Sequence, residues 1–168
     1  GIIEAHRDDA AMTGGFAEAL ADHPDVGISV ITLTDGAARI HRNYSPEMMR
    51  LARRAEGSRS VAIMRGAQLI GADIPGDGRL GEEVYRKEGE DFLEQVLDDV
   101  KPDFLIVPSL GDPLWDHRAA AEIAQVVAKG EIPIYFMDTI NGTDRNGNPI
   151  SPTHVIPLEE KLVARRRD

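Results

Sequence analysis

Apolar and polar residues form alternating blocks along this chain, and the blocks predict strands and helices in turn. Strands are predicted where short apolar runs are rich in β-branched residues, at 2–3, 26–33, 104–108 and 132–137. Helices are predicted where apolar residues recur at helical spacing, at 16–21, 45–69, 82–100 and 119–128. Because the run 104–108 is apolar throughout, we expect a central parallel strand there, covered on both faces. The alternation predicts an α/β fold of three layers, in which helices flank a mostly parallel, Rossmann-like sheet.

Details within these segments are also predicted. Ser45-Pro46 offers an N-cap and a proline at the first helical position, so a helix starts there and runs towards Leu69, with Gly57 as the point where it would break. The stretch from Ile70 to Gly78 is so rich in glycine and turn residues that we expect a brief strand and then a loop. Beyond residue 137 we expect a turn-rich loop, a short extended segment around His154 and a last helix. The expected buried side of the helix 82–100 consists of Val84, Phe92, Leu93, Val96 and Leu97.

The length of 168 residues fits one domain with a sizeable core. The chain has no initiator methionine, since Gly1 opens directly on the first apolar run, and its last residues lie within a helical pattern. We therefore expect one domain over residues 1–168 that is trimmed at both ends.

Composition and charge narrow the classes of function. The chain is 42% hydrophobic and 29% charged, as in ordinary soluble globular proteins, and no apolar run is long enough to span a membrane. Its formal net charge of -10 argues against nucleic acid or an anionic membrane surface as the main partner, because both are polyanions. The absence of cysteine excludes disulfides, thiolate metal sites and a cysteine nucleophile. With no signal peptide visible, a cytoplasmic location is the default expectation, and a homo-oligomer is compatible with the sequence.

One short stretch concentrates groups that bind metals. The sequence Glu4-Ala5-His6-Arg7-Asp8-Asp9 places an imidazole and two carboxylates directly after the first apolar run. His6 and Asp9 are three residues apart, so their side chains can converge on one point in a tight turn, whereas Asp8 points elsewhere. A divalent ion needs at least one more protein ligand, and a catalytic site keeps a further position open for water. The later stretch Asp112-Pro113-Leu114-Trp115-Asp116-His117 supplies the third candidate, His117.

The same residues have a simpler interpretation. Asp8 and Asp9 can complement the dipole at a helix N-terminus and accept backbone N–H bonds there, with His6 incidental. Two features favour the metal site. His6 follows an apolar run and precedes a predicted helix, which is where open α/β sheets place their sites. Asp116-His117 follows the strand 104–108 in the same way, and parallel strands deliver both segments to one edge of the sheet.

These two stretches resemble the motifs of zinc-dependent N-acetylglucosaminyl deacetylases, the PIG-L or LmbE-like family related to GlcNAc-PI de-N-acetylase. The family has Ala-His-Pro-Asp-Asp-Glu after the first strand and Asp-x-His-x-Asp-His after a later one. In this chain the first motif reads Ala5-His6-Arg7-Asp8-Asp9-Ala10, and the second occupies 112–117. Weaker similarity covers nearly the whole chain, through Gly14-Gly15, Asp77-Gly78, Lys101-Pro102-Asp103 and Glu160-Lys161-Leu162.

The resemblance implies an activity and its parts. Zn²⁺ would be the cofactor, bound by His6, Asp9 and His117, with Asp8 as the general base that takes a proton from a metal-bound water. The implied reaction is hydrolysis of an amide, a linear C–N bond. An acyl group, in the family acetyl, leaves the nitrogen of an amino sugar such as N-acetylglucosamine or of a glycoconjugate. We therefore expect a small-molecule substrate of this class.

The chain departs from the family at positions that bear on activity. Leu114 replaces the first histidine of the second motif, which assists the oxyanion or the leaving group, and leucine cannot donate a hydrogen bond. Arg7 replaces a proline and adds a cation that would favour an anionic substrate, while Ala10 replaces a glutamate. Residues predicted to support a metal ligand or to contact substrate are Arg7, Asp116, His41, Asp77 and His154.

Two other classes of function stay open. Leu114 suggests a metal-binding or carbohydrate-binding homologue that does not hydrolyse its ligand or that has an altered specificity. A nucleotide-type α/β binding domain is disfavoured, because the loop after the first strand reads His-Arg-Asp-Asp instead of Gly-x-Gly-x-x-Gly. Since the three candidate ligands and the candidate base are all present, the zinc-dependent deacetylase is the preferred interpretation.

Overall fold

The fold is a parallel sheet between helices, in a computed structural model that describes residues 1–7, 9, 17, 19–37, 44–64, 66–76 and 78–137. The strand order in the sheet is β3-β2-β1-β4-β5, and all four strand pairings are parallel. The strands are β1 (Ile2–Glu4), β2 (Ser29–Thr34), β3 (Gln68–Ile74), β4 (Leu105–Pro108) and β5 (Ile134–Met137). This topology confirms the predicted α/β class.

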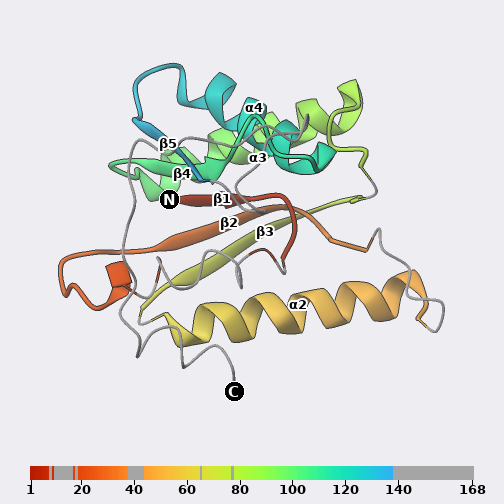
Figure 1. Ribbon diagram of the computed structural model, residues 1–168, viewed down its shortest axis with the longest axis horizontal. Helices are drawn as coiled ribbons and strands as arrows, with labels where there is room; N and C mark the ends of the chain where they lie inside the picture. The colour runs from red at the N-terminus through yellow and green to blue at the C-terminus, as the bar shows by residue number, and fades with distance from the viewer. Residues whose placement is uncertain are drawn as a thin grey trace.

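Helices cover both faces of the sheet (Figure 1). α2 (Pro46–Ile63) lies on one face, and α3 (Glu83–Val100) and α4 (Trp115–Ala128) lie together on the other. Side chains alternate between the two faces along each strand. Ile2 therefore belongs to the core under α2, whereas Ile3 belongs to the core under α3 and α4. The three central strands β1, β2 and β4 are buried on both sides, as their apolar residues predict, whereas the edge strands β3 and β5 are partly exposed.

β1 and β4 are neighbours in the sheet although they lie far apart in the sequence, with Ile2 opposite Ile106 in parallel register. The chain runs from β1 outwards to β2 and β3, then returns to β4 and β5 on the other side. Because the strands are parallel, the segments after Glu4 and Pro108 leave the sheet at the same edge. The strand order reverses between β1 and β4, and open α/β sheets bind ligands in such a crevice.

The structure corrects the predicted length of two elements. α2 ends at Ile63 rather than near Leu69, and it continues through Gly57 without a break. β3 spans seven residues, longer than its glycine and turn residues predict, because it pairs with β2 along most of its length.

The predicted buried side of α3 is also only partly right. Leu93, Val96 and Leu97 are buried, but Val84 is 65% exposed. The reason is helical geometry: Val84 precedes Leu93 by nine residues, and at about 100° per residue this places the two side chains on opposite sides of the helix. Val84 therefore faces away from the sheet.

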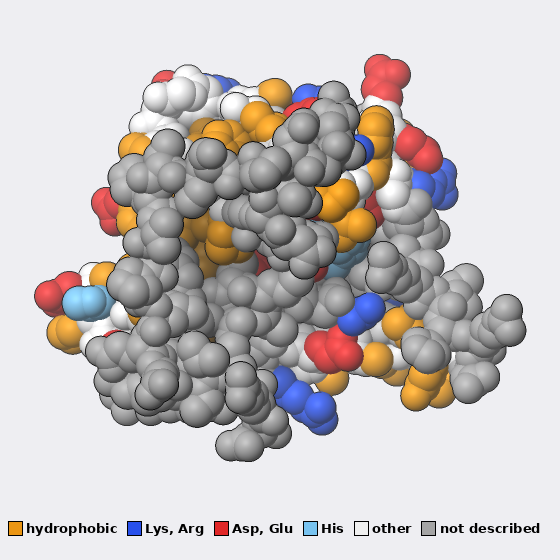
Figure 2. Space-filling model, in the orientation of Figure 1, with side chains coloured by type: hydrophobic (Ala, Val, Ile, Leu, Met, Phe, Trp, Pro, Cys, Tyr) orange, Lys and Arg blue, Asp and Glu red, His pale blue; other side chains and the backbone are white. Residues whose placement is uncertain are grey.

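Among the described residues visible in Figure 2, charged side chains of both signs are interspersed with hydrophobic ones. Some of the basic residues of α2 form ion pairs with acidic residues at or near the ends of β2 and β3. Nε of Arg50 donates to Oδ2 of Asp35 at 2.7 Å, just after β2, and Arg54 donates to Asp73 in β3. Among the residues described, no helix combines the length and the apolar character needed to cross a lipid bilayer.

Candidate metal centre

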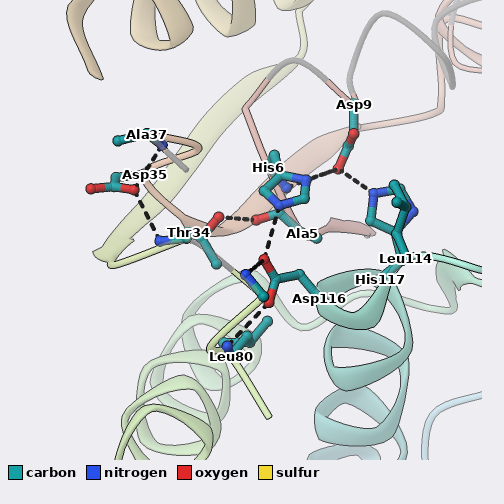
Figure 3. A network of polar contacts seen from close by, with 12 residues as sticks. Ala5, His6, Asp9, Thr34, Asp35, Ala37, Leu80, Leu114, Asp116 and His117 are labelled. Carbon is teal, nitrogen blue, oxygen red and sulfur yellow. Dashed lines mark hydrogen bonds and ion pairs between the residues drawn. The ribbon is translucent and has the colours of Figure 1, made fainter. Parts of the chain in front are cut away.

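The loop after β1 is fixed at its start by the neighbouring strand β2. The backbone N–H and the hydroxyl of Thr34 both donate to the carbonyl oxygen of Ala5, at 2.9 and 2.8 Å. The carboxylate of Asp9 then folds back and accepts the backbone N–H of His6 at 2.8 Å, while the backbone N–H of Asp9 donates to the carbonyl oxygen of His6 at 3.2 Å. These reciprocal bonds form a tight turn that brings the His6 ring against the Asp9 carboxylate (Figure 3).

His117 is positioned by the start of α4. The carboxylate of Asp112 accepts the backbone N–H of Leu114 at 2.8 Å, which forms a turn directly before the helix. His117 then lies in the first helical turn and is fully buried. Its ring faces the loop after β1 (Figure 3), so the two motifs meet where β1 and β4 end.

The two histidines and Asp9 converge on one point. Oδ2 of Asp9 lies 3.3 Å from Nδ1 of His6 and 3.2 Å from Nε2 of His117, and the centroids of the two rings are 5.4 Å apart. One potential ligand atom from each residue lies within 4.8 Å of the other two. In a tetrahedral site with bonds of about 2.1 Å, ligand atoms are about 3.4 Å apart. The three side chains therefore fit a metal ion after small movements.

Each histidine is held through the ring nitrogen that faces away from this point. Nε2 of His6 donates to Oδ2 of Asp116 at 3.1 Å, and Nδ1 of His117 donates to Oδ2 of Asp112 at 3.1 Å. Both carboxylates are buried. Metal-binding histidines almost always donate their second N–H to such a group, which fixes the ring orientation and the tautomer. Nδ1 of His6 and Nε2 of His117 are consequently directed at the place where Asp9 lies.

Asp116 also connects this cluster to the loop after β3. In addition to the bond from His6, its two oxygens accept backbone N–H bonds from Gly78 at 3.0 Å and from Leu80 at 3.1 Å. One buried carboxylate thus orients a candidate ligand and holds the adjacent loop. Figure 3 shows it between the His6 ring and Leu80.

The charged groups of the cluster shift one another's protonation. Burial would lower the pKa of His6, but the bonds to Asp116 and Asp9 outweigh it and raise the pKa to about 10. Burial would also lower the pKa of His117, yet Asp112 and Asp9 raise it to about 9. Burial would raise the pKa of Asp9, and its bonds to the two histidines instead hold that pKa well below the usual range. At neutral pH the metal-free cluster therefore carries imidazolium protons that a metal ion has to displace.

The other predicted site residues have different outcomes. Four of them lie outside the residues that the structure describes: Asp8, His41, Asp77 and His154. Asp116 occupies the supporting position just given, next to His6. Asp112 opens the second motif, but the sequence does not single it out as a site residue. The reason is that the bond between Asp112 and His117 depends on the turn before α4.

The sequence predicts that Arg7 adds a cation beside the site, but in the structure its side chain points away from the cluster. Its guanidinium donates to Oδ1 of Asp73 at 2.8 Å and to the carbonyl oxygen of Ala72 at 3.4 Å, and the residue is buried. The physical reason is space, because Gly57 in α2 and Gly71 in β3 leave room for the side chain between these two elements.

The fold and the cluster together define an α/β protein with a His-Asp-His group at the switch point of a parallel sheet. Residues 2–128 match the family PIG-L, described as GlcNAc-PI de-N-acetylase. Since this match covers well over half of the chain, the protein belongs to that family. A comparison with curated proteins gives no match.

Three solved structures illustrate the similarity. GalB, the 4-carboxy-2-hydroxymuconate hydratase from Pseudomonas putida KT2440, is 26% identical, with a TM-score of 0.66 over 76% of this chain and 54% of that one. The N,N'-diacetylchitobiose deacetylase from Pyrococcus horikoshii is 23% identical, with a TM-score of 0.63 over 76% and 48%. A deacetylase of the teicoplanin biosynthesis pathway is 15% identical, with a TM-score of 0.81 over 99% and 80%. The chain spans about half the length of the first two structures, and its likeness to the last two shows the fold alone.

Proposed function

We propose that this protein is a zinc-dependent hydrolase that removes an acyl group from the amide nitrogen of an amino sugar or glycoconjugate, and that this acyl group is acetyl. The observation that carries the proposal is the convergence of His6, Asp9 and His117, in which a buried carboxylate backs each imidazole. Membership of a family described as GlcNAc-PI de-N-acetylase supports the choice of substrate.

The donor set favours zinc. Two imidazole nitrogens and one carboxylate oxygen are a ligand set of catalytic zinc sites, whereas Ca²⁺ and Mg²⁺ prefer oxygen ligands. When bound, zinc supplies Lewis-acid chemistry, since it polarises a carbonyl oxygen and lowers the pKa of water towards about 7. His6, Asp9 and His117 would hold the ion, and Asp116 and Asp112 would keep the two rings in orientation.

We assign the proton transfers to Asp8, which is adjacent to Asp9 in the loop. As general base it would take a proton from the water whose oxygen adds to the amide carbonyl carbon. The C–N bond then breaks, and the same carboxyl group would return the proton to the leaving amine. The products are a carboxylic acid and a free amino group. This assignment rests on the first motif, because Asp8 is not among the described residues.

A second candidate function is the addition of water to a carbon–carbon double bond of an unsaturated carboxylic acid. Its support is the likeness to GalB, described as a hydratase, and the presence of Leu114 in place of the histidine that assists the oxyanion or the leaving group. Hydration of a double bond releases no amine, so it does not require a donor for a leaving group at that position.

Metal content tests the site. We expect about one zinc per chain, as in catalytic zinc sites, by elemental analysis of protein purified without chelators. His117→Ala should lose this zinc. His23→Ala is the matched control, because His23 lies exposed in the turn region before β2, and it should keep the metal. An unmodified protein without metal, even after incubation with zinc, would contradict the proposal.

Substrates then separate the candidates. The zinc-loaded protein is incubated with N-acetylglucosamine compounds, and the released acetate is measured. It is also incubated with a hydroxymuconate-type acid, and the loss of ultraviolet absorbance is measured. Acetate release that disappears in Asp8→Ala supports the deacetylase. Hydration without acetate release supports the second candidate, and binding without either reaction indicates a homologue that does not turn over its ligand.

A further inference from the structure

Arg7 stands between the candidate ligands His6 and Asp9 in the sequence, yet its side chain runs into the space between α2 and β3. The residue is only 8% exposed. Its guanidinium donates to Oδ1 of Asp73 at 2.8 Å and to the carbonyl oxygen of Ala72 at 3.4 Å. The loop that carries two candidate metal ligands is thus joined to β3, which lies two strands away from β1 in the sheet.

Two glycines make room for this side chain. A Cβ atom at Gly71 in β3 would lie 2.7 Å from Nη2 of Arg7 and 2.8 Å from its Cζ and Nη1, closer than real Cβ atoms approach their neighbours. A Cβ atom at Gly57 in α2 would lie 2.8 Å from the carbonyl oxygen of Arg7. A side chain at Gly71 would therefore displace the guanidinium, whereas one at Gly57 would displace the backbone of the loop.

Stability alone does not explain these residues. Glycine inside a helix or a strand is destabilising relative to alanine. The buried guanidinium loses its hydration, and because its partner Asp73 is half exposed, water screens the ion pair, which therefore offsets little of that loss. Among the described residues, Nε of Arg7 has no hydrogen-bond partner, so the loss of hydration is only partly offset. Gly57, Gly71 and the buried arginine are each unfavourable for stability, and all three meet at the loop after β1. This indicates that the conformation of the loop has a role other than stability.

We propose that Arg7 is a positioning residue for the metal centre. Its ion pair with Asp73, in the channel left open by Gly57 and Gly71, holds the loop in the conformation in which Asp9 and the preceding histidine meet at one point. Thr34 of β2 holds the start of the same loop at Ala5. Arg7 holds the loop at the next point towards Asp9. This inference rests on the metal site of the proposed function and is independent of the substrate.

Gly71→Ala is the sharpest test, because the closest contacts of the added Cβ would be with the guanidinium. We expect the zinc dissociation constant, measured by competition with a chromophoric chelator, to rise about 10- to 100-fold, the range for residues that support a metal ligand. The absorption spectrum of the Co²⁺-substituted protein should change too, because it reports the geometry of the ligands. In an Arg7→Ala background, Gly71→Ala should have no further effect, since no guanidinium remains to be displaced.

Three other variants complete the design. Asp73→Asn leaves the channel open and removes the charge that pairs with the arginine, so it should also weaken zinc binding. Gly27→Ala is the matched control for the glycine substitution, because nothing lies within 4 Å of a Cβ atom there. Arg50→Ala is the matched control for the ion pair, because this substitution removes a different ion pair of α2, the one with Asp35 just after β2. Both controls should bind zinc as the unmodified protein does.

The outcomes separate this inference from the proposed function. If Gly71→Ala and Asp73→Asn both keep the zinc affinity and the cobalt spectrum of the unmodified protein, the positioning role is overturned and the metal site stands. A further loss on adding Gly71→Ala to Arg7→Ala would also overturn the role, because the effect would not depend on the guanidinium. If the unmodified protein binds no zinc, both the site and the inference are wrong.

Discussion

The two halves of the candidate metal centre are built in different ways. His117 is held within one stretch of chain, because Asp112, five residues earlier, accepts its ring proton and the first turn of α4 sets its place. His6 is held across the molecule, since its partner Asp116 lies 110 residues away. The His117 side chain is fully buried, and that of His6 is 19% exposed. One half is thus fixed by a helix and its preceding turn, whereas the other requires the assembled sheet.

The largest effect is expected where the two halves meet. Asp9→Ala removes a carboxylate that contacts both imidazoles, so zinc affinity should fall by more than about 100-fold, beyond the range for residues that only orient a ligand. Calorimetric titration with zinc measures the loss. Asp25→Ala, at an exposed position, should bind zinc normally. A change smaller than about tenfold would show that Asp9 is not a ligand.

A smaller effect should distinguish the two supporting carboxylates. Asp116→Ala is expected to weaken zinc binding more than Asp112→Ala, with both inside the range of about 10- to 100-fold. Asp116 orients the ring of His6 and also holds the 78–80 loop, which comes from a distant part of the chain. Asp112 orients the ring of His117 and holds the adjacent turn, but His117 is also fixed by its place in α4. Competition titrations give the ratio of the two dissociation constants. Equal losses, or a larger loss in Asp112→Ala, would mean that the halves are held alike.

The last prediction concerns the pH dependence of stability in the metal-free protein. The pKa values of His6 and His117, raised to about 10 and about 9, lie above the value of about 6.5 for an unfolded histidine. Between about pH 6.5 and pH 9 to 10, the folded state therefore binds more protons than the unfolded chain. The stabilisation that these protons give is complete below about pH 6.5 and is lost as the pH rises through about 9 to 10.

Chemical denaturation at neutral and alkaline pH measures this dependence. Saturating zinc should flatten it, because metal-bound imidazoles have already lost the protons concerned. The free energy of unfolding of the metal-free protein should accordingly fall as the pH rises, and that of the zinc-loaded protein should change less. Equal slopes in the two forms would contradict the assignment of His6 and His117 to the metal site.

The place of the site can be predicted from the sequence, because it depends on rules that act on whole elements. The apolar runs before His6 and before Asp112 predict strands, and parallel strands deliver the loops at their carboxyl ends to one edge of the sheet. The spacing of His6 and Asp9 then indicates a tight turn, which the structure has. The order of the strands brings His117 to the same crevice.

The contacts within the site are harder to predict, because they depend on the direction of single side chains. Nothing in the spacing indicates that Arg7 turns towards Asp73 instead of facing the ligands on either side of it. Gly57 suggests a helix break and Gly71 a loop, since local propensity treats glycine as a feature of its own segment. In the structure both glycines are explained by Arg7 in a distant loop, since Gly71 faces its guanidinium and Gly57 its carbonyl oxygen, and β3 is longer than propensity predicts.

The chain separations spanned by the contacts of the His6 loop have a consequence for folding. Thr34, Asp73 and Asp116 reach this loop over 29, 66 and 110 residues respectively. Closing each long segment costs chain entropy, which is recovered only when the packing around it forms. The ligand set therefore comes together only after α4 has docked on the sheet, and its proposed anchor at Arg7 forms only after β3 has paired. Metal uptake should then be among the last events of folding, because a chain in which only β1 and β2 have paired offers no site to fill.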